Sequence, residues 1–234
     1  MAVPVGESHQ HPGDRLAGHG GPSSSHPLKL ARIADRPPSS GASTVMGLTQ
    51  YYTATSLDGF IADAEHSLGW LFTQRREDDG PLSWDAFIAG VGAMAMGSTT
   101  YEWILRYEFG GKAVGEWVWP YDVPCWVFTH RELPVVPGAA IAFTSAAVAD
   151  VHAEMAAAAG GRNVWIVGGG DLAGQFAAAR LLDEVLVMIA PVTLGSGAPL
   201  LPRRLELRLD ELGRNGDFAC ARYTVVDHLY VTAG

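Results

Sequence analysis

Residues 164–173 have the sequence Val-Trp-Ile-Val-Gly-Gly-Gly-Asp-Leu-Ala, and they carry the strongest structural signal in this chain of 234 residues. Four apolar residues, typical of a buried strand, run into three glycines and then into a helix start. Glycine lacks a Cβ and lets the backbone approach a ligand closely, and the free N–H groups of a helix N-terminus favour a phosphate. The stretch therefore predicts a phosphate-binding junction, with a tight turn that binds nothing as the alternative. The fit of Gly168, Gly170 and Ala173 to a relaxed dinucleotide fingerprint is a common chance match.

Two further junctions have the same form. Residues 95–100, Ala-Met-Gly-Ser-Thr-Thr, offer a glycine, three hydroxyl groups and a helix start, which suits a pyrophosphate; a merely well-capped helix is the alternative. Residues 128–131, Phe-Thr-His-Arg, end a strand, and Arg131 suits a phosphate monoester such as the 2′-phosphate of NADPH, with a solvated surface arginine as the alternative. Because the carboxyl ends of parallel strands lie on one sheet edge, the three junctions together predict a dinucleotide site.

Strands and helices alternate around these junctions. The strands expected from β-branched, aromatic and apolar runs are 49–56, 92–96, 125–129, 141–143, 163–167 and 185–192, with 60–62 as a brief extended continuation of the first. The expected helices begin near 81–85, with Phe87, Ile88 and Val91 on the apolar side, at a capping box formed by Thr99 and Glu102, at 146–159 between Ser145 and Gly160, and at 171–180.

The C-terminal part has a different pattern. Leu205, Leu207 and Leu209 alternate with charged residues, residues 214–217 supply a turn, and 218–231 return as a β run. Parallel βα units followed by a β-hairpin predict an α/β fold of three layers, in which a mixed, mostly parallel sheet has helices on both faces.

Composition divides the chain near residue 46. Residues 1–45 are rich in Gly, Pro, Ser and His and lack apolar periodicity, which predicts a disordered N-terminal tail ahead of a structured domain at 46–234. A start codon assigned too far upstream would also explain the tail, because Met46 stands just before the first structured segment. The four histidines of the tail match no ligand spacing, so we expect no metal site there.

Charge and cysteine content exclude several classes of protein. The formal net charge is −9 and no long basic run is present, which argues against a nucleic-acid partner. Cys125 and Cys220 lie in apolar runs and are expected to be buried free thiols. Because no apolar stretch approaches the ~20 residues of a membrane helix and no secretory signal is visible, we expect a cytoplasmic protein that does not bind a membrane.

Four motifs in this order resemble the dihydrofolate-reductase-like superfamily. They are Thr-Ser-Leu-Asp-Gly-Phe-Ile-Ala at 55–62, Met-Gly-Ser-Thr-Thr-Tyr at 96–101, Ile-Val-Gly-Gly-Gly at 166–170 and Ala-Pro-Val-Thr-Leu-Gly-Ser-Gly at 190–197. The resemblance covers about residues 48–232 and is closest to the C-terminal reductase domain of bacterial riboflavin biosynthesis. It implies a dihydrofolate-reductase-like fold, NADPH as cofactor, a small-molecule substrate and a homodimer.

The resemblance also implies roles for individual residues. Ala54 and Ser56 would bind substrate, with Asp58 beside them, and the cofactor would be held by Gly97, Ser98, Thr99, Thr100, Thr129, His130, Arg131, Val167, Gly168, Gly169, Gly170, Asp171 and Leu172. Asp85 is the candidate for the acid that true dihydrofolate reductases carry on their first helix; a helix-end carboxylate stabilised by the dipole is the alternative. Asp58 is a second candidate catalytic residue, or a turn cap.

The chain departs from its relatives at two positions. Many relatives have Arg where Ser98 stands, and Asp171 puts a negative charge beside the expected phosphate site, so that its side chain would have to point away.

The resulting expectation is an NADPH-dependent oxidoreductase that reduces a pyrimidine- or pteridine-like substrate. A 5-amino-6-(5-phosphoribosylamino)uracil reductase of the riboflavin type is the leading form. In it, NADPH carries the hydride, and Asp85 or an ordered water supplies the proton. A dihydrofolate or pteridine reductase and a non-catalytic NADPH-binding module are the alternatives.

Overall fold

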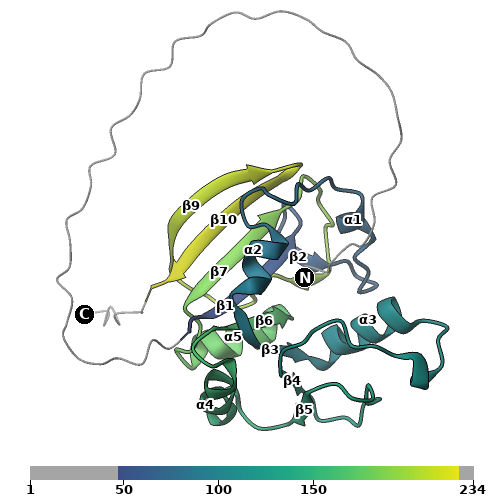
Figure 1. The fold of residues 1–234 in the computed structure, drawn as a ribbon. Helices are drawn as coiled ribbons and strands as arrows, with labels where there is room; N and C mark the ends of the chain where they lie inside the picture. The colour runs from purple at the N-terminus through teal and green to yellow at the C-terminus, as the bar shows by residue number, and fades with distance from the viewer. Residues whose placement is uncertain (1–46, 227–234) are drawn as a thin grey trace, which may run out of the picture. The chain divides into compact units, whose positions relative to one another are not determined.

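The computed structural model describes residues 47–226 (Figure 1). The expected disordered tail at 1–45, with its four histidines, lies outside the described residues, as does the last part of the run expected at 218–231. Within 47–226 the elements follow one another as β1 Thr49–Thr55, β2 Phe60–Ala62, α1 Gly69–Phe72, α2 Trp84–Ala89, β3 Val91–Gly97, α3 Ser98–Phe109, a 3₁₀ helix Val114–Glu116, β4 Cys125–Phe128, β5 Ile141–Thr144, α4 Val148–Ala159, β6 Asn163–Gly168, α5 Gly170–Ala178, β7 Glu184–Ile189, β8 Ala198–Pro199, β9 Leu207–Asn215 and β10 Phe218–Val225.

One large sheet forms the middle of this domain. Its strand order is β5-β4-β3-β6-β1-β7-β10-β9, in which the first six strands are parallel to one another. β10 runs antiparallel to both β7 and β9, and β9 and β10 form the yellow hairpin at the top of Figure 1. The expected mixed sheet with a C-terminal hairpin is therefore confirmed.

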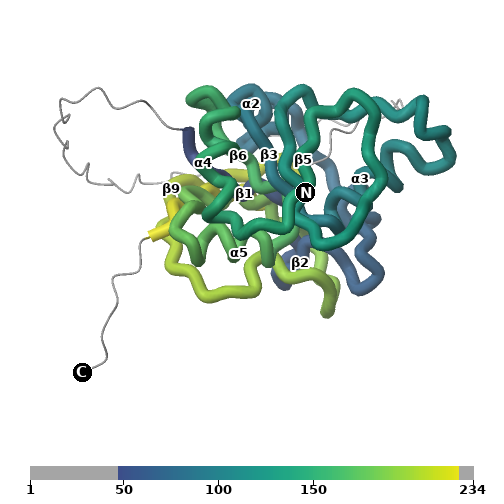
Figure 2. Tube along the Cα trace, turned by 90° about the horizontal axis from the view of Figure 1, so that it is seen from below, coloured from purple at the N-terminus to yellow at the C-terminus, as the bar shows by residue number. Residues whose placement is uncertain are grey.

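Helices cover both faces of the sheet. On one face α2 and α3 bury Phe87, Tyr101 and Ile104 against a core that includes Trp165. On the other face α4 and α5 bury side chains such as Met155 and Phe176. Figure 2 shows α2 and α5 on opposite sides of β1 and β6. The three-layer α/β architecture is confirmed, and each parallel strand is apolar because both of its faces are covered.

Three local expectations are confirmed: a helix start near 81–85, Gly160 at the end of a helix, and two buried cysteines. Ser83 caps α2 by accepting a hydrogen bond from the Ala86 amide at 3.4 Å, and Gly160 ends α4 in the left-handed conformation, with φ at 62°. Cys125 and Cys220 are buried and free. Among residues 47–226 no helix has both the length and the apolar composition to cross a membrane.

The predicted helix starts need correction. α3 begins at Ser98 with Gly97 as its N-cap, and no side chain caps it, because the carboxylate of Glu102 binds Arg131 instead of reaching back to Thr99. α4 begins at Val148 with Ala147 as its N-cap, so Ser145 does not cap it; a local turn in which the Thr144 hydroxyl accepts from the Ala146 amide ends the strand first.

Two assignments beside the first motif also change. Val91 lies in β3 rather than on the apolar side of α2, because α2 already ends at Ala89. Residues 60–62 are not a continuation of β1: they form the separate strand β2, which pairs with β8 in a small second sheet. The turn at 57–59 redirects the chain.

Candidate functional site

The carboxyl ends of β3 and β6 form the point where the chain changes direction across the sheet. β3 and β6 are neighbours, with Met96 paired to Gly168. From β3 the chain continues outward through α3 to β4, whereas from β6 it continues through α5, on the opposite face, to β7. Since the two helices diverge here, a crevice opens between them, and such crevices are where α/β sheets bind ligands.

A cavity of about 380 Å³ lies at this crevice. Its volume is within the range of small-molecule sites. Ten of the residues expected to bind the cofactor line it: Gly97, Ser98, Thr99, Thr100, Val167, Gly168, Gly169, Gly170, Asp171 and Leu172. The structure therefore brings two of the three predicted junctions together, those that follow β3 and β6.

Glycines allow the two junctions to touch. A Cβ on Gly168 would lie 3.0 Å from the Thr100 hydroxyl oxygen, closer than most real contacts, while a Cβ on Gly97 would have nothing nearer than 4.0 Å. A Cβ on Gly170 would overlap the carbonyl oxygens of Pro199 and Leu200, which cover the start of α5. The triple glycine thus serves close backbone approach on both sides of the loop.

Two helix N-termini meet at the cavity wall. α3 has 12 residues and α5 has 9, and the first amide groups of each have no partner inside the helix. The positive ends of both helix dipoles therefore face the same space. None of the described residues that line the cavity is Lys or Arg, so backbone groups supply its attraction for an anion. These residues fit the diphosphate of a dinucleotide.

Asp171, in the first turn of α5, has a carboxylate that is paired with other side chains. Its carboxylate accepts hydrogen bonds from Gln175 at 2.9 Å and from Arg203 at 3.0 Å, the latter an ion pair. These two hydrogen bonds, that of Gln175 first, lower the pKa of Asp171. The pair with Arg203 offsets the negative charge of the carboxylate, while Asp171 remains among the residues that line the cavity.

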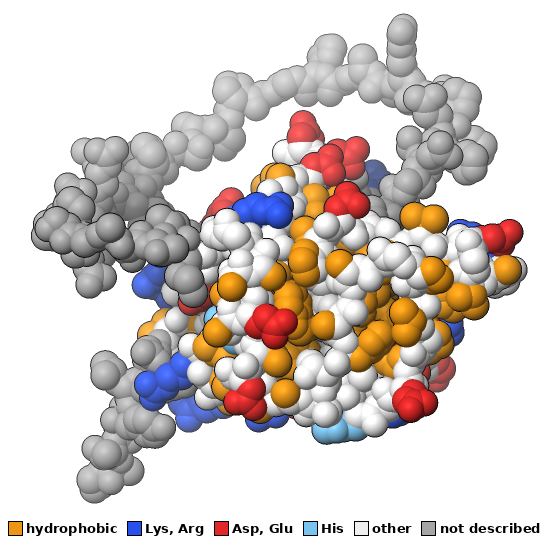
Figure 3. Space-filling view, turned by 60° about the horizontal axis from the view of Figure 1, so that its bottom comes forward, with side chains coloured by type: hydrophobic (Ala, Val, Ile, Leu, Met, Phe, Trp, Pro, Cys, Tyr) orange, Lys and Arg blue, Asp and Glu red, His pale blue; other side chains and the backbone are white. Residues whose placement is uncertain are grey.

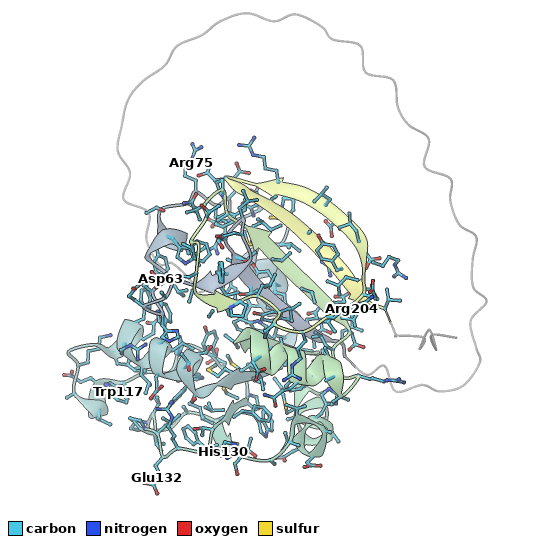
Figure 4. The ribbon with its side chains drawn as sticks, turned by 180° about the vertical axis from the view of Figure 1, so that it is seen from behind. Asp63, Arg75, Trp117, His130, Glu132 and Arg204 are labelled. Carbon is cyan, nitrogen blue, oxygen red and sulfur yellow. The ribbon has the colours of Figure 1, made fainter. Side chains whose placement is uncertain are left out.

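The third junction lies beside the cavity. Phe128 lines the cavity, whereas Thr129, His130 and Arg131 do not. The Thr129 hydroxyl accepts from the Arg131 amide at 2.9 Å, which closes the loop on itself. Figure 4 shows His130 at the lower end of the domain, well away from Asp63, whose turn borders the cavity.

Arg131 already has an anionic partner. Its guanidinium donates to both carboxylate oxygens of Glu102, at 3.0 and 2.8 Å, and this contact lowers the pKa of Glu102. Arg131 is 56% exposed. The ion pair ties the loop after β4 to α3.

The residues expected to bind substrate are buried or make hydrogen bonds that hold the fold together. Ala54 and Ser56 are buried and do not line the cavity. The Ser56 hydroxyl donates to Asp58 at 2.6 Å, and Asp58 accepts from the amides of Leu194 and Gly195 at 3.0 and 2.7 Å. The hydroxyl first, and then the two amides, lower the pKa of Asp58. Asp58 thus joins the turn after β1 to the loop after β7.

Asp85 lies in the first turn of α2 with an exposed side chain. It is not among the residues that line the cavity. The structure therefore does not bring either candidate acid, Asp85 or Asp58, to the crevice.

Other residues that line the cavity were not predicted from the sequence. They are Thr53, Ile61, Ala62, His66, Leu68, Trp103, Phe128, Gln175, Ala198, Pro199 and Pro202. His66 adopts a φ of 59° in a turn where Asp63 accepts from the amides of Glu65 and Ser67. The one local signal was on α3, where Trp103 follows Thr99 by four residues and so lies on the same helix face.

The middle of the face shown in Figure 3 carries few charged side chains, and others gather toward its rim. Apolar side chains form broad areas there, and acidic side chains are scattered singly among them. Within residues 47–226 no group of three or more His, Cys, Asp and Glu side chains could hold a metal ion.

The fold and the crevice define an α/β protein of the dihydrofolate-reductase-like class. Residues 111–214 match the RibD C-terminal domain family. The uncharacterized protein YwjB of Bacillus subtilis is 33% identical over 172 residues, which cover 69% of this chain and 88% of YwjB. The chain belongs to the RibD C-terminal domain family, a family of NAD(P)H-dependent reductases.

Solved structures share the fold. A putative riboflavin biosynthesis protein from Shewanella sp. PV-4 is 24% identical, with a TM-score of 0.60 over 77% of this chain and 99% of that one. A diaminohydroxyphosphoribosylaminopyrimidine deaminase/5-amino-6-(5-phosphoribosylamino)uracil reductase from Thermotoga maritima is 14% identical, with a TM-score of 0.52 over 77% of this chain but only 57% of that one. A pyrimidine reductase-like protein from Corynebacterium diphtheriae is 16% identical, with a TM-score of 0.51 over 80% and 96%.

Proposed function

We propose that the chain is an NADPH-dependent reductase acting on a pyrimidine- or pteridine-like substrate. Its leading form is a reductase of the type named for the Thermotoga maritima protein, which acts on a phosphoribosylaminouracil. The observation that carries the proposal is the cavity between β3 and β6, which two helix N-termini and a triple glycine border. Helix N-termini at such a crevice favour phosphate groups, as in the diphosphate of a dinucleotide.

Different residues would bind different parts of the cofactor. Amides at 98–100 and 170–172 would hold the diphosphate, and Arg131 would leave Glu102 to bind the 2′-phosphate of the adenosine. Ile61, Ala62 and Leu172 give the cavity an apolar wall that excludes water. Bound NADPH supplies the hydride, and the protein contributes orientation and exclusion of solvent.

Neither candidate acid, Asp58 or Asp85, lines the cavity, so the proton has to reach the substrate by another route. Asp58 is held by one hydroxyl and two amides, and Asp85 is exposed on α2. We therefore propose that an ordered water donates the proton to the substrate. Asp85 would supply that proton only if α2 moves when the ligands bind.

The test is a titration of intrinsic tryptophan fluorescence with NADPH and with NADH, followed by turnover. We expect saturable quenching with a preference for NADPH, and oxidation of NADPH at 340 nm with 5-amino-6-(5-phosphoribosylamino)uracil-type compounds or dihydrofolate. No quenching by either nucleotide would overturn the proposal.

A non-catalytic NADPH-binding protein is a second candidate. The absence of Asp58 and Asp85 from the cavity lining favours it. Tight NADPH binding without oxidation against any pyrimidine or pteridine substrate would support this candidate over the reductase.

We further propose that the chain acts in the cytoplasm as a homodimer. β9 is an edge strand of the sheet and exposes Leu209 and Leu212, apolar side chains that a second copy would cover. Light scattering at micromolar concentration should give twice the chain mass, and a monomer mass would refute the dimer.

A further inference from the structure

Three aromatic rings from two separate elements stack at the mouth of the cavity. The Phe72 ring of α1 lies 5.4 Å from Tyr107 and 6.4 Å from Trp103 of α3, and the two α3 rings are 4.8 Å apart. All three planes are within 22° of parallel. Figure 1 shows α1 and α3 on the same side of the sheet. We call Phe72, Trp103 and Tyr107 the aromatic ledge.

The ledge connects solvent to the cavity. Phe72 is 40% exposed and Tyr107 is 46% exposed, while Trp103 is partly buried and lines the cavity. An exposed aromatic surface that continues into a pocket is typical of a ligand site rather than of a chance surface residue. Trp103 and Tyr107 are four residues apart, so α3 presents both on one face.

The surroundings of the ledge do not suit a phosphate on the substrate. No Lys or Arg is found among the described residues that line the cavity. Arg203 is paired with Asp171 and Arg131 with Glu102, while Arg106 of α3 is exposed to solvent. A phosphate carried past Trp103 into the cavity would therefore find no basic side chain among the described residues that line it.

We propose that the aromatic ledge binds the planar ring of the substrate by stacking and that it selects heteroaromatic rings without a phosphate. The ring stacks on the ledge and reaches past Trp103 into the cavity. The inference rests on the proposed function where it takes the bound molecule to be the hydride acceptor. The ledge as a binding site does not depend on that function. It narrows the substrate class to unphosphorylated heterocycles, and so favours the dihydrofolate or pteridine form of the proposed function over the phosphoribosylaminouracil form.

The experiment measures binding of riboflavin and FMN, which share one planar ring system and differ in a phosphate. Equilibrium dialysis is carried out with and without saturating NADPH. We expect riboflavin to bind at least tenfold more tightly than FMN, and Phe72→Ala and Tyr107→Ala each to weaken riboflavin binding about tenfold, the range found for loss of one stacked base.

Trp117→Ala is the matched control. Trp117 stacks on Phe109 with centroids 5.1 Å apart and planes 12° from parallel, but it does not line the cavity. Figure 4 shows Trp117 near the edge of the domain. This variant should bind riboflavin as the wild type does. Because Phe72 and Tyr107 lie outside the cavity lining, their truncation should leave NADPH affinity unchanged. The loss of one stacked ring should lower the melting temperature by only a few degrees.

Three results would overturn the inference: no binding of riboflavin, equal binding by the wild type and both ledge variants, or tighter binding of FMN. NADPH affinity, measured on the same samples, separates the two proposals. A protein that binds riboflavin at the ledge but not NADPH refutes the reductase and keeps the ledge, whereas one that binds NADPH but not riboflavin refutes the ledge alone.

Discussion

Arg131 and Glu102 form a two-point ion pair, with Nη1 3.0 Å from Oε1 and Nη2 2.8 Å from Oε2. The side chains are 56% and 30% exposed, and pairs at such exposure contribute only about 0–1 kcal/mol to stability. A phosphate dianion is a stronger partner for guanidinium than a solvated carboxylate. The pair is therefore a contact that a 2′-phosphate could replace at little cost.

Substitution of either partner should change nucleotide preference. Arg131→Ala should weaken NADPH binding about tenfold and leave NADH binding nearly unchanged, because only NADPH has the 2′-phosphate. Glu102→Gln should strengthen NADPH binding by releasing the guanidinium. Fluorescence titration measures both, and equal effects on NADPH and NADH would show that Arg131 does not meet the 2′-phosphate.

Two glycines of the crevice should respond differently to alanine. Gly170→Ala should destabilise the protein by about 2 kcal/mol or more, because the new Cβ overlaps the carbonyl oxygens of Pro199 and Leu200. Gly97→Ala has free space and ordinary backbone angles, so its melting temperature should match the wild type while its NADPH affinity falls. A stable Gly170→Ala protein with wild-type affinity would refute the packing described for α5.

Asn215 should be essential to the loop before α2. Its fully buried side chain accepts from the Glu77 amide at 2.7 Å and donates to the carbonyls of Glu77 and Pro81 at 3.1 Å. Asn215→Ala should lower the free energy of unfolding by about 2–4 kcal/mol in urea titrations, since buried backbone groups lose their partners. A loss below ~0.5 kcal/mol would contradict this role.

Acid stability should depend on Asp58. Its pKa is lowered in the folded protein by the Ser56 hydroxyl and by the amides of Gly195 and Leu194. The stabilisation is thus complete above the unfolded pKa of about 3.9 and is lost as the pH falls through the lower folded value. Below about pH 4 the wild type should lose stability more steeply than Asp58→Asn. Ser56→Ala should have a shallower acid limb than the wild type, and parallel curves for all three proteins would contradict the assignment.

The sequence predicts the parallel sheet and the two central junctions because their signals are local. Apolar runs such as 164–167 are buried on both faces, and glycine followed by a helix start is visible within ten residues. The capping box at Thr99 is wrong for a reason that no local pattern contains: Glu102 is drawn away by Arg131, 29 residues later.

The aromatic ledge and the small second sheet depend on tertiary contacts in the same way. Phe72 meets Trp103 only because α1 folds back over α3, and β2 finds its partner β8 after more than 130 residues of intervening chain. The positions of Ser56 and Asp58 were predicted beside the site, yet their hydrogen bonds to the loop at 194–195 could not be read from spacing.

The central claim is that the start of α3 and the start of α5 together bind the diphosphate of NADPH. A crystal structure of the protein grown with NADPH tests it most directly. The account predicts diphosphate oxygens within hydrogen-bond distance of amides in both segments, 98–100 and 170–172. Nucleotide density elsewhere on the protein, or none in the crevice at saturating NADPH, would contradict it.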